Sequence, residues 1–135
     1  ASILKPIIEK NNGQSGLSSI GVVSGATYKE QAISLRKTLP SAPFLIPGFG
    51  AQGASASDAC APLITDQSDS GIKSFGLINA SRSVLFPKNS YSVNSIEEWQ
   101  DIILTELEKT NDILINTKTW KSLINDKTKS AWRTG

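Results

Sequence analysis

The spacing of hydrophobic residues changes several times along the chain, and three short apolar runs stand out from the polar segments around them. These runs cover residues 19–24, 44–46 and 75–79, and they combine aliphatic or aromatic residues with small ones. Such runs are typical of buried strands. Apolar residues at helical spacing follow each of the first two runs. The pattern therefore predicts an α/β fold in which three parallel strands are joined by right-handed helical crossovers.

The first predicted helix runs from about residue 28 to residue 39 and has one apolar face. That face is formed by Ala32, Leu35 and Leu39. Arg36 and Lys37 lie off this face. Thr27 and Glu30 have the spacing of a capping box, so we expect Thr27 to cap the helix.

Two further helices are predicted by their N-terminal signals. Ser55 or Ser57 caps a helix that ends at about Ile64, and Ser95 with Glu98 opens a long amphipathic helix. The predicted parts of the chain are a strand-and-helix domain over residues 1–94, the long helix over residues 95–116, and a tail with one short helix over residues 117–135.

Composition narrows the classes of function. The 135 residues are enough for one domain with a hydrophobic core. The chain has 14 Lys and Arg against 12 Asp and Glu, and the resulting net charge of +2 is too small to indicate a nucleic-acid partner. Histidine is absent, and the lone Cys60 excludes an internal disulfide and two-cysteine zinc motifs. No apolar run approaches the roughly 20 residues of a membrane helix. We therefore expect a cytoplasmic protein without a metal and without a membrane partner.

In parallel α/β proteins, ligands bind beyond the carboxyl ends of the strands, so the segments that follow the predicted strands carry the candidate chemistry. The second strand is followed by Pro47 and a loop with Gly48, Gly50 and Gly53. Glycines let the backbone approach a ligand closely and expose its amides to an anion. Gln52 adds a neutral hydrogen-bond donor to this loop.

The third strand leads to Ser81 and Arg82, and Arg82 is the arginine nearest to any predicted strand end. Its planar guanidinium suits bidentate recognition of a phosphate. The two adjacent strand ends therefore predict a phosphate site, because together they supply backbone amides, the Gln52 side chain and the Arg82 side chain. No Lys, Asp, Glu or Cys is placed at these strand ends to transfer a proton, so we expect no catalytic residue in this chain.

The three strand-end motifs in order resemble orotidine 5′-phosphate decarboxylase, and most closely its longer-chain branch. The motifs are Gly21–Thr27, Phe44–Gly53 and Asn79–Ser83, and the resemblance covers roughly residues 16–110. It implies a (β/α)8 TIM barrel of which the three strands are the sixth, seventh and eighth. A complete barrel takes about 250 residues. The chain is therefore predicted to be the carboxyl-terminal half of such a barrel, with the half-barrel in residues 1–94.

The resemblance also implies roles for particular residues. Gln52 and Arg82 would bind the 5′-phosphate of a nucleotide monophosphate, helped by the backbone amides of Ser81 and Arg82. Val23 and Pro47 would form an apolar wall beside the pyrimidine. The reaction implied is decarboxylation of orotidine monophosphate to uridine monophosphate, a lyase step of pyrimidine biosynthesis that needs no metal or organic cofactor.

Three interpretations stay open at this point. In the first, the chain is the carboxyl-terminal part of a decarboxylase. It is inactive without the amino-terminal half of the enzyme, because the family's Asp-x-Lys motif is absent. The complete enzyme is expected to be a homodimer. In the second, it is a stand-alone half-barrel that binds a phosphate ligand without catalysis and dimerises to cover its open sheet edges. In the third, it is another phosphate-binding barrel, such as an enzyme of tryptophan or histidine biosynthesis, although the Gly-Ala-Gln-Gly loop argues against this.

Overall fold

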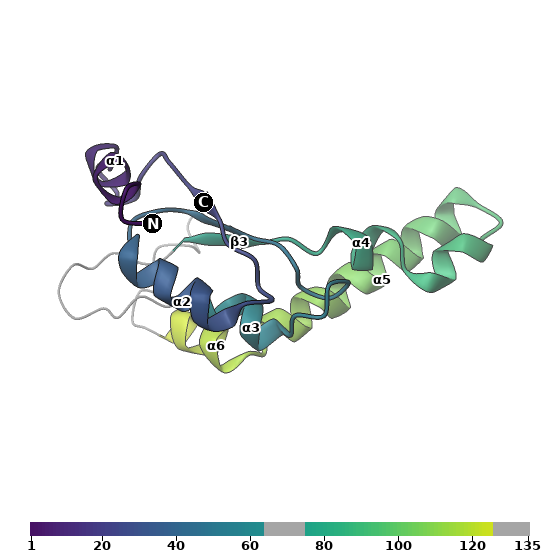
Figure 1. Cartoon of the computed structure of the whole chain (residues 1–135). Helices are drawn as coiled ribbons and strands as arrows, with labels where there is room; N and C mark the ends of the chain where they lie inside the picture. The colour runs from purple at the N-terminus through teal and green to yellow at the C-terminus, as the bar shows by residue number, and fades with distance from the viewer. Residues whose placement is uncertain (64–74, 126–135) are drawn as a thin grey trace. The chain divides into compact units, whose positions relative to one another are not determined.

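The computed structural model describes residues 1–63 and 75–125 of the chain (Figure 1). It contains two compact units, residues 1–79 and residues 80–135. The elements of the first unit are α1 (Lys5–Lys10), β1 (Val22–Val23), α2 (Lys29–Thr38), β2 (Phe44–Ile46), α3 (Ala56–Cys60), the 3-10 helix η1 (Ala61–Leu63) and β3 (Gly76–Ile78). Those of the second unit are α4 (Ser81–Leu85), the 3-10 helix η2 (Lys88–Ser92), α5 (Ile96–Ile115) and α6 (Lys118–Asn125).

The first unit is built on a three-stranded parallel sheet with the order β1-β2-β3. Val23 pairs with Leu45, and Leu45 pairs in turn with Leu77. The expected α/β class and the parallel order of the strands are confirmed, and the arrangement is consistent with half of a (β/α)8 barrel. β2 has the length of the apolar run that predicted it, whereas β1 and β3 are shorter than theirs.

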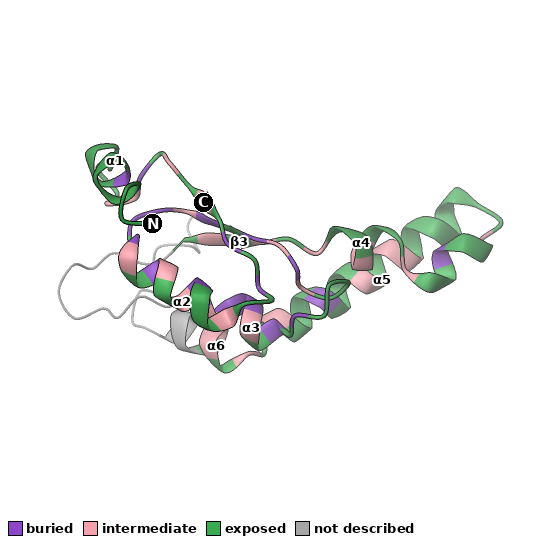
Figure 2. Ribbon diagram, in the orientation of Figure 1, coloured by how far each residue is buried: buried purple, intermediate pink, exposed green. Residues whose placement is uncertain are grey.

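One face of this sheet forms the core of the first unit. Phe44 and Ile46 project from β2 to this face and are fully buried. The helical residues that are buried with them are Ala32, Leu39, Ala56, Ala59, Cys60 and Leu63. Purple, buried segments accordingly lie along β2, α2 and α3 in Figure 2.

Helix α2 corrects two expectations. Its N-cap residue is Tyr28, and no side chain caps it, so the capping role expected for Thr27 is wrong. The reason lies in the preceding backbone: the Ala26 N–H donates to the Pro47 carbonyl at 2.8 Å, which keeps the chain paired beside β2 almost to Thr27. Arg36 was expected to lie off the apolar face of the helix, but its exposed fraction is only 1%.

Arg36 is buried because five backbone carbonyls surround its guanidinium. Nε donates to Pro62 at 2.8 Å, and Nη2 donates to Phe75 at 3.0 Å. Nη1 points to the carbonyls of Leu39, Pro40 and Ala42 at 3.4, 3.1 and 2.7 Å. Burial lowers the pKa of Arg36 to about 10, so the group remains a cation at neutral pH. A single charged side chain therefore joins the end of α2 to η1 and to the segments that enter β2 and β3.

Helix α3 is capped by Ser55, one of the two serines that the sequence offered as its cap, and the cap is a capping box with Asp58. The Ser55 hydroxyl accepts from the Asp58 N–H at 3.1 Å, and the Asp58 carboxylate accepts from the Ser55 N–H at 3.2 Å. The Ser55 hydroxyl also donates to that carboxylate at 2.6 Å. Lys29 lies 3.6 Å from the same carboxylate and links the first turns of α2 and α3.

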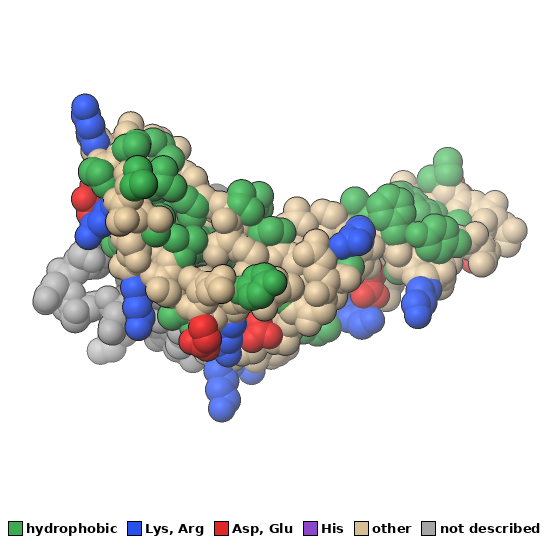
Figure 3. Space-filling model, in the orientation of Figure 1, with side chains coloured by type: hydrophobic (Ala, Val, Ile, Leu, Met, Phe, Trp, Pro, Cys, Tyr) green, Lys and Arg blue, Asp and Glu red, His purple; other side chains and the backbone are tan. Residues whose placement is uncertain are grey.

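The second unit is helical, and exposed hydrophobic side chains gather where its long helix α5 begins (Figure 3). Ser95 caps α5 as predicted, since its hydroxyl accepts from the Glu98 N–H at 3.1 Å, while the Glu98 carboxylate reaches back to the Asn94 N–H at 3.0 Å. A short helix, α6, begins the predicted tail, and residues 126–135 of that tail lie outside the described part. None of the helices described has both the length and the apolar composition to cross a membrane.

Candidate carboxyl-edge site of the sheet

The backbone pairing between β1 and β2 continues beyond the strands and fixes the residues that follow them. The N–H groups of Val22, Ser24 and Ala26 donate in turn to the carbonyls of Pro43, Leu45 and Pro47, at 2.9, 2.8 and 2.8 Å. Because side chains alternate along a strand, this regular ladder puts Val23, Leu45 and Pro47 on the same face of the sheet. The two residues expected to form an apolar wall, Val23 and Pro47, therefore share one face at the carboxyl ends of neighbouring strands.

The loop after Pro47 is closed by its own backbone. Gly48, Gly50 and Gly53 have positive φ angles of 104°, 74° and 88°, which residues with a side chain rarely adopt. The Ala54 N–H donates to the Gly48 carbonyl at 3.2 Å, and the Gly53 N–H donates to Gly50 at 2.9 Å. The glycine-rich sequence thus folds into a tight loop at the end of β2.

The carboxamide of Gln52 turns back over the start of this loop. A Cβ atom placed on Gly48 would lie 3.5 Å from Oε1 of Gln52, and it would lie 3.6 Å from both the Ala26 nitrogen and Cγ2 of Thr27. Gln52 itself is exposed to solvent. Its amide thus lies where the segments after β1 and β2 meet, and a side chain at position 48 would be in van der Waals contact with it.

The end of β3 continues the same edge. The Asn79 N–H donates to the Ile46 carbonyl at 3.0 Å, which extends the pairing of β3 with β2 by one step. Only Asn79 and Ala80 separate β3 from α4, whose first residues are Ser81 and Arg82. Arg82 is exposed, and within the described part of the chain it has no ion-pair partner. Ser81 and Arg82 belong to the second unit, whereas Val23, Pro47 and Gln52 belong to the first.

The first turns of α2 and α3, which follow β1 and β2 along the chain, carry Lys29 and Asp58. Hydrogen bonds from the Ser55 hydroxyl and the Ser55 N–H lower the pKa of the Asp58 carboxyl, and Lys29 lowers it further. Asp58 is thus an anion engaged in the cap. The groups at the edge itself are an amide, a proline and a valine, which can bind and shape a ligand but do not transfer protons at neutral pH.

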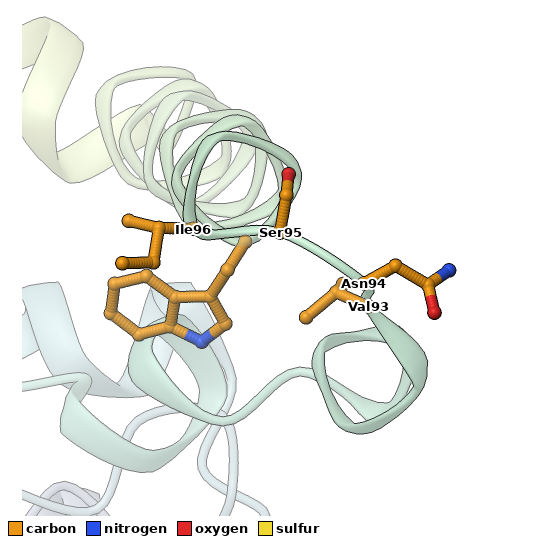
Figure 4. Close-up of a pocket in the computed structure, with 5 residues that line it drawn as sticks. Val93, Asn94, Ser95 and Ile96 are labelled. Carbon is orange, nitrogen blue, oxygen red and sulfur yellow. The ribbon is translucent and has the colours of Figure 1, made fainter.

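Two surface hollows lie elsewhere. One, of about 490 Å³, is lined at the amino-terminal side of the sheet by residues that include Asn11, Ser15, Pro43 and Phe75. The other, of about 360 Å³, is lined where α5 begins by Val93, Asn94, Ser95, Ile96 and Trp99. In Figure 4 the Asn94 carboxamide and the Ser95 hydroxyl point away from the side chains of Val93 and Ile96, which leaves the second hollow apolar. Among residues 1–63 and 75–125, no cluster of His, Cys, Asp or Glu could hold a metal ion.

The fold and the strand-end loop place the chain in the class of α/β proteins built from consecutive parallel βα units. Comparison with known proteins gives a narrower answer: the chain is similar to orotidine 5′-phosphate decarboxylases, which confirms the resemblance drawn from its motifs. The enzyme of that name from Rhodopirellula baltica is 35% identical over an alignment of 119 residues, and the match covers 84% of this chain and 37% of the relative. No family model matches the chain.

Two further relatives carry the same name. The decarboxylase of Clostridium kluyveri is 46% identical over 77 residues, which cover 57% of this chain and 24% of that enzyme. The decarboxylase of Halorubrum lacusprofundi is 39% identical over 71 residues, which cover 53% of this chain and 25% of that enzyme. The chain thus matches between about a quarter and two fifths of each of these relatives, which is consistent with its being a fragment of such an enzyme.

Proposed function

We propose that the chain is the carboxyl-terminal part of an orotidine 5′-phosphate decarboxylase, in which it holds the phosphate and the pyrimidine of the nucleotide. The observation that carries this proposal is the position of Gln52. Its carboxamide lies over Gly48 at the junction of two strand-end segments, on a loop whose sequence matches the family motif. A neutral amide donor at such a junction suits a phosphate oxygen.

Arg82 is the second phosphate ligand of this proposal. It follows β3 after a short connection, and β3 is the direct neighbour of β2 in the sheet. The order of the strand-end motifs matches the family resemblance, and that resemblance implies that Arg82 and Gln52 bind the same phosphate. Its guanidinium would form charge-assisted hydrogen bonds with the phosphate, and the backbone amides of Ser81 and Arg82 would add to them.

Val23 and Pro47 form the apolar wall of the proposed site. Both lie on the face of the sheet that the helices leave open, and Val23 is 67% exposed. A planar pyrimidine that lies against them would remove this apolar surface from water. The proton that completes the reaction would come from residues of the amino-terminal half of the enzyme, and we propose that the complete enzyme is a cytoplasmic homodimer.

A chimaeric enzyme tests this function. The segment of the R. baltica decarboxylase that matches this chain is replaced by the chain, and decarboxylation of orotidine monophosphate is measured. We expect activity, and we expect Gln52→Ala and Arg82→Ala each to raise KM about 10- to 100-fold, because each removes a hydrogen bond to a charged group. Gln31→Ala and Lys88→Ala are matched controls, since both alter exposed side chains away from the strand ends.

The outcomes separate the proposed enzyme part from a simple binding module. A folded chimaera without decarboxylation, but with binding of uridine monophosphate that depends on Arg82, would favour the stand-alone phosphate-binding module. Unchanged KM values in both site variants would remove Gln52 and Arg82 from the phosphate site.

A further inference from the structure

Thr27 lies where the segments after β1 and β2 meet, and the two branches of its side chain face different glycines. A Cβ atom placed on Gly48 would lie 3.6 Å from Cγ2 of Thr27 and 3.5 Å from Oε1 of Gln52. A Cβ atom placed on Gly25 would instead lie 3.8 Å from Oγ1 of Thr27. The methyl group of Thr27 therefore shares the space over Gly48 with the Gln52 carboxamide, while the hydroxyl faces Gly25.

The direction of the Gln52 carboxamide is not set by a hydrogen bond. A backbone N–H does lie at the same point, since the Ala26 nitrogen is 3.6 Å from the Cβ position on Gly48. That N–H already donates to the Pro47 carbonyl at 2.8 Å. Within the described part of the chain, the carboxamide makes no hydrogen bond of its own. Its direction therefore depends on packing, and a freely rotating carboxamide would lose conformational entropy when it binds a ligand.

The backbone on both sides of Thr27 is attached to the ends of the Gln52 loop. On one side, the Ala26 N–H bonds to Pro47, the residue before the loop. On the other side, Lys29 lies 3.6 Å from the carboxylate of Asp58, which belongs to the capping box that follows the loop. Threonine is also β-branched, so rotation of its side chain about χ1 is restricted. The Thr27 methyl group is thus a fixed surface beside the Gln52 carboxamide.

We propose that Thr27 is a positioning residue for the phosphate ligand Gln52, because its methyl group restricts the carboxamide to the direction in which it binds the phosphate. This inference rests on the proposed function and adds a residue that acts through Gln52. It also gives Thr27 a role in place of the helix cap that its sequence position predicted. Preorganisation of this kind strengthens binding without a further contact to the ligand.

The hydroxyl of Thr27 is the competing group, because Thr27 is exposed and a hydroxyl can donate directly to a phosphate oxygen. Of the two branches, however, Cγ2 is the one that lies among the closest atoms to the Gly48 position. The geometry therefore favours packing by the methyl group over a direct bond from the hydroxyl.

The chimaeric decarboxylase provides the test. Thr27→Ser removes the methyl group and keeps the hydroxyl, and it is expected to raise KM about 3- to 10-fold, less than Gln52→Ala does, because the carboxamide is still present but less restricted. Thr27→Val keeps the branched shape and removes the hydroxyl, so its KM should stay within about twofold of the original. Thr38→Ser is the matched control, since it deletes the same methyl group at the last residue of α2.

A double-mutant cycle separates positioning from a general structural effect. In the Gln52→Ala background, Thr27→Ser is expected to cause no further rise in KM, because the group through which Thr27 acts is already gone. A merely structural role would raise KM by the same factor in both backgrounds, and that result overturns the inference.

Two other results also overturn it. One is a raised KM in Thr27→Val with an unchanged KM in Thr27→Ser, which would make the hydroxyl a direct ligand of the phosphate. The other is an unchanged KM in Thr27→Ser. In each of these cases Gln52→Ala alone still raises KM, so the proposed function stands. An unchanged KM in Gln52→Ala, in contrast, overturns the phosphate role of Gln52 and this inference together.

Discussion

The guanidinium carbon of Arg36 lies 3.6 Å from the centroid of the Phe44 ring. Phe44 is the first residue of β2, and its own side chain is buried in the core. The cation therefore lies over an aromatic face while its N–H groups bond to the surrounding carbonyls. Arg36 thereby couples the helical layer to the amino-terminal end of the central strand.

Replacement of Arg36 by Met is expected to lower the free energy of unfolding by about 3 kcal/mol or more, because buried carbonyls lose their donors and the ring contact is lost. Arg36→Lys should recover only part of this loss, since an ammonium cannot reach several carbonyls in a fixed plane. Urea unfolding followed by circular dichroism measures both changes. Lys37→Met is the control, because Lys37 is exposed on the same helix. Equal effects at positions 36 and 37 would contradict the role of Arg36.

The cap of α3 predicts a pH dependence. The pKa of Asp58 is lowered chiefly by the Ser55 hydroxyl, so the carboxylate stabilises the fold at pH values above the ordinary pKa of an aspartate. This contribution is lost as the pH falls through the lowered pKa, because the protonated group no longer accepts both bonds. Ser55→Ala should move the pKa of Asp58 back toward its ordinary value, and NMR titration of that carboxyl measures the shift. A larger shift in Lys29→Gln than in Ser55→Ala would show that the ion pair dominates instead.

Gly48 and Gly53 form a matched pair for testing the strand-end loop. Both have positive φ angles, so an alanine at either position should cost about 1–3 kcal/mol of backbone strain. An alanine at position 48 would also meet the Gln52 carboxamide, whereas nothing lies within 4 Å of the corresponding position at Gly53. In the chimaeric enzyme, Gly48→Ala should therefore raise KM by more than Gly53→Ala does. Equal KM values would mean that the position of Gln52 is unimportant for the ligand.

The start of α5 gives a prediction for the second unit. Ser95→Ala removes the hydroxyl that accepts from Glu98 and should cost about 1 kcal/mol of local stability. Hydrogen exchange of the amides in the first turn of α5 measures the change, and it should become faster. Ser92→Ala is the control, because Ser92 is an exposed serine of η2 before the cap. Unchanged exchange in Ser95→Ala would show that the Glu98 contact with Asn94 is sufficient for the cap.

Local rules predicted much of this fold. The strand runs and the caps at Ser55 and Ser95 depend on residues within a few positions of one another, so the sequence alone contains their causes. The cap at Thr27 failed because a distant segment decides it: the carbonyl of Pro47 keeps Ala26 in the ladder. Arg36 was missed for the same reason, since its partners at Pro62 and Phe75 are far along the chain.

The candidate site divides in a similar way. A loop rich in glycine could be predicted from residues 48–53, because positive φ angles favour glycine wherever they occur. The placement of the Gln52 carboxamide over Gly48 could not, because it depends on how the segments after β1 and β2 meet. The apolar pattern also did not predict that Val23, Leu45 and Leu77 are exposed, because exposure on a strand depends on which other elements cover it.

The two ends of β2 are therefore held in different ways. At its amino-terminal end, the Arg36 guanidinium donates to backbone carbonyls, which every residue type possesses. These hydrogen bonds therefore depend on the side chain of Arg36 and not on the side chains of the residues that accept them. At its carboxyl end, the loop depends on glycines and on one amide in a defined place. A substitution in the loop would consequently change the carboxyl end of β2, while Arg36 still anchors the amino-terminal end of the strand.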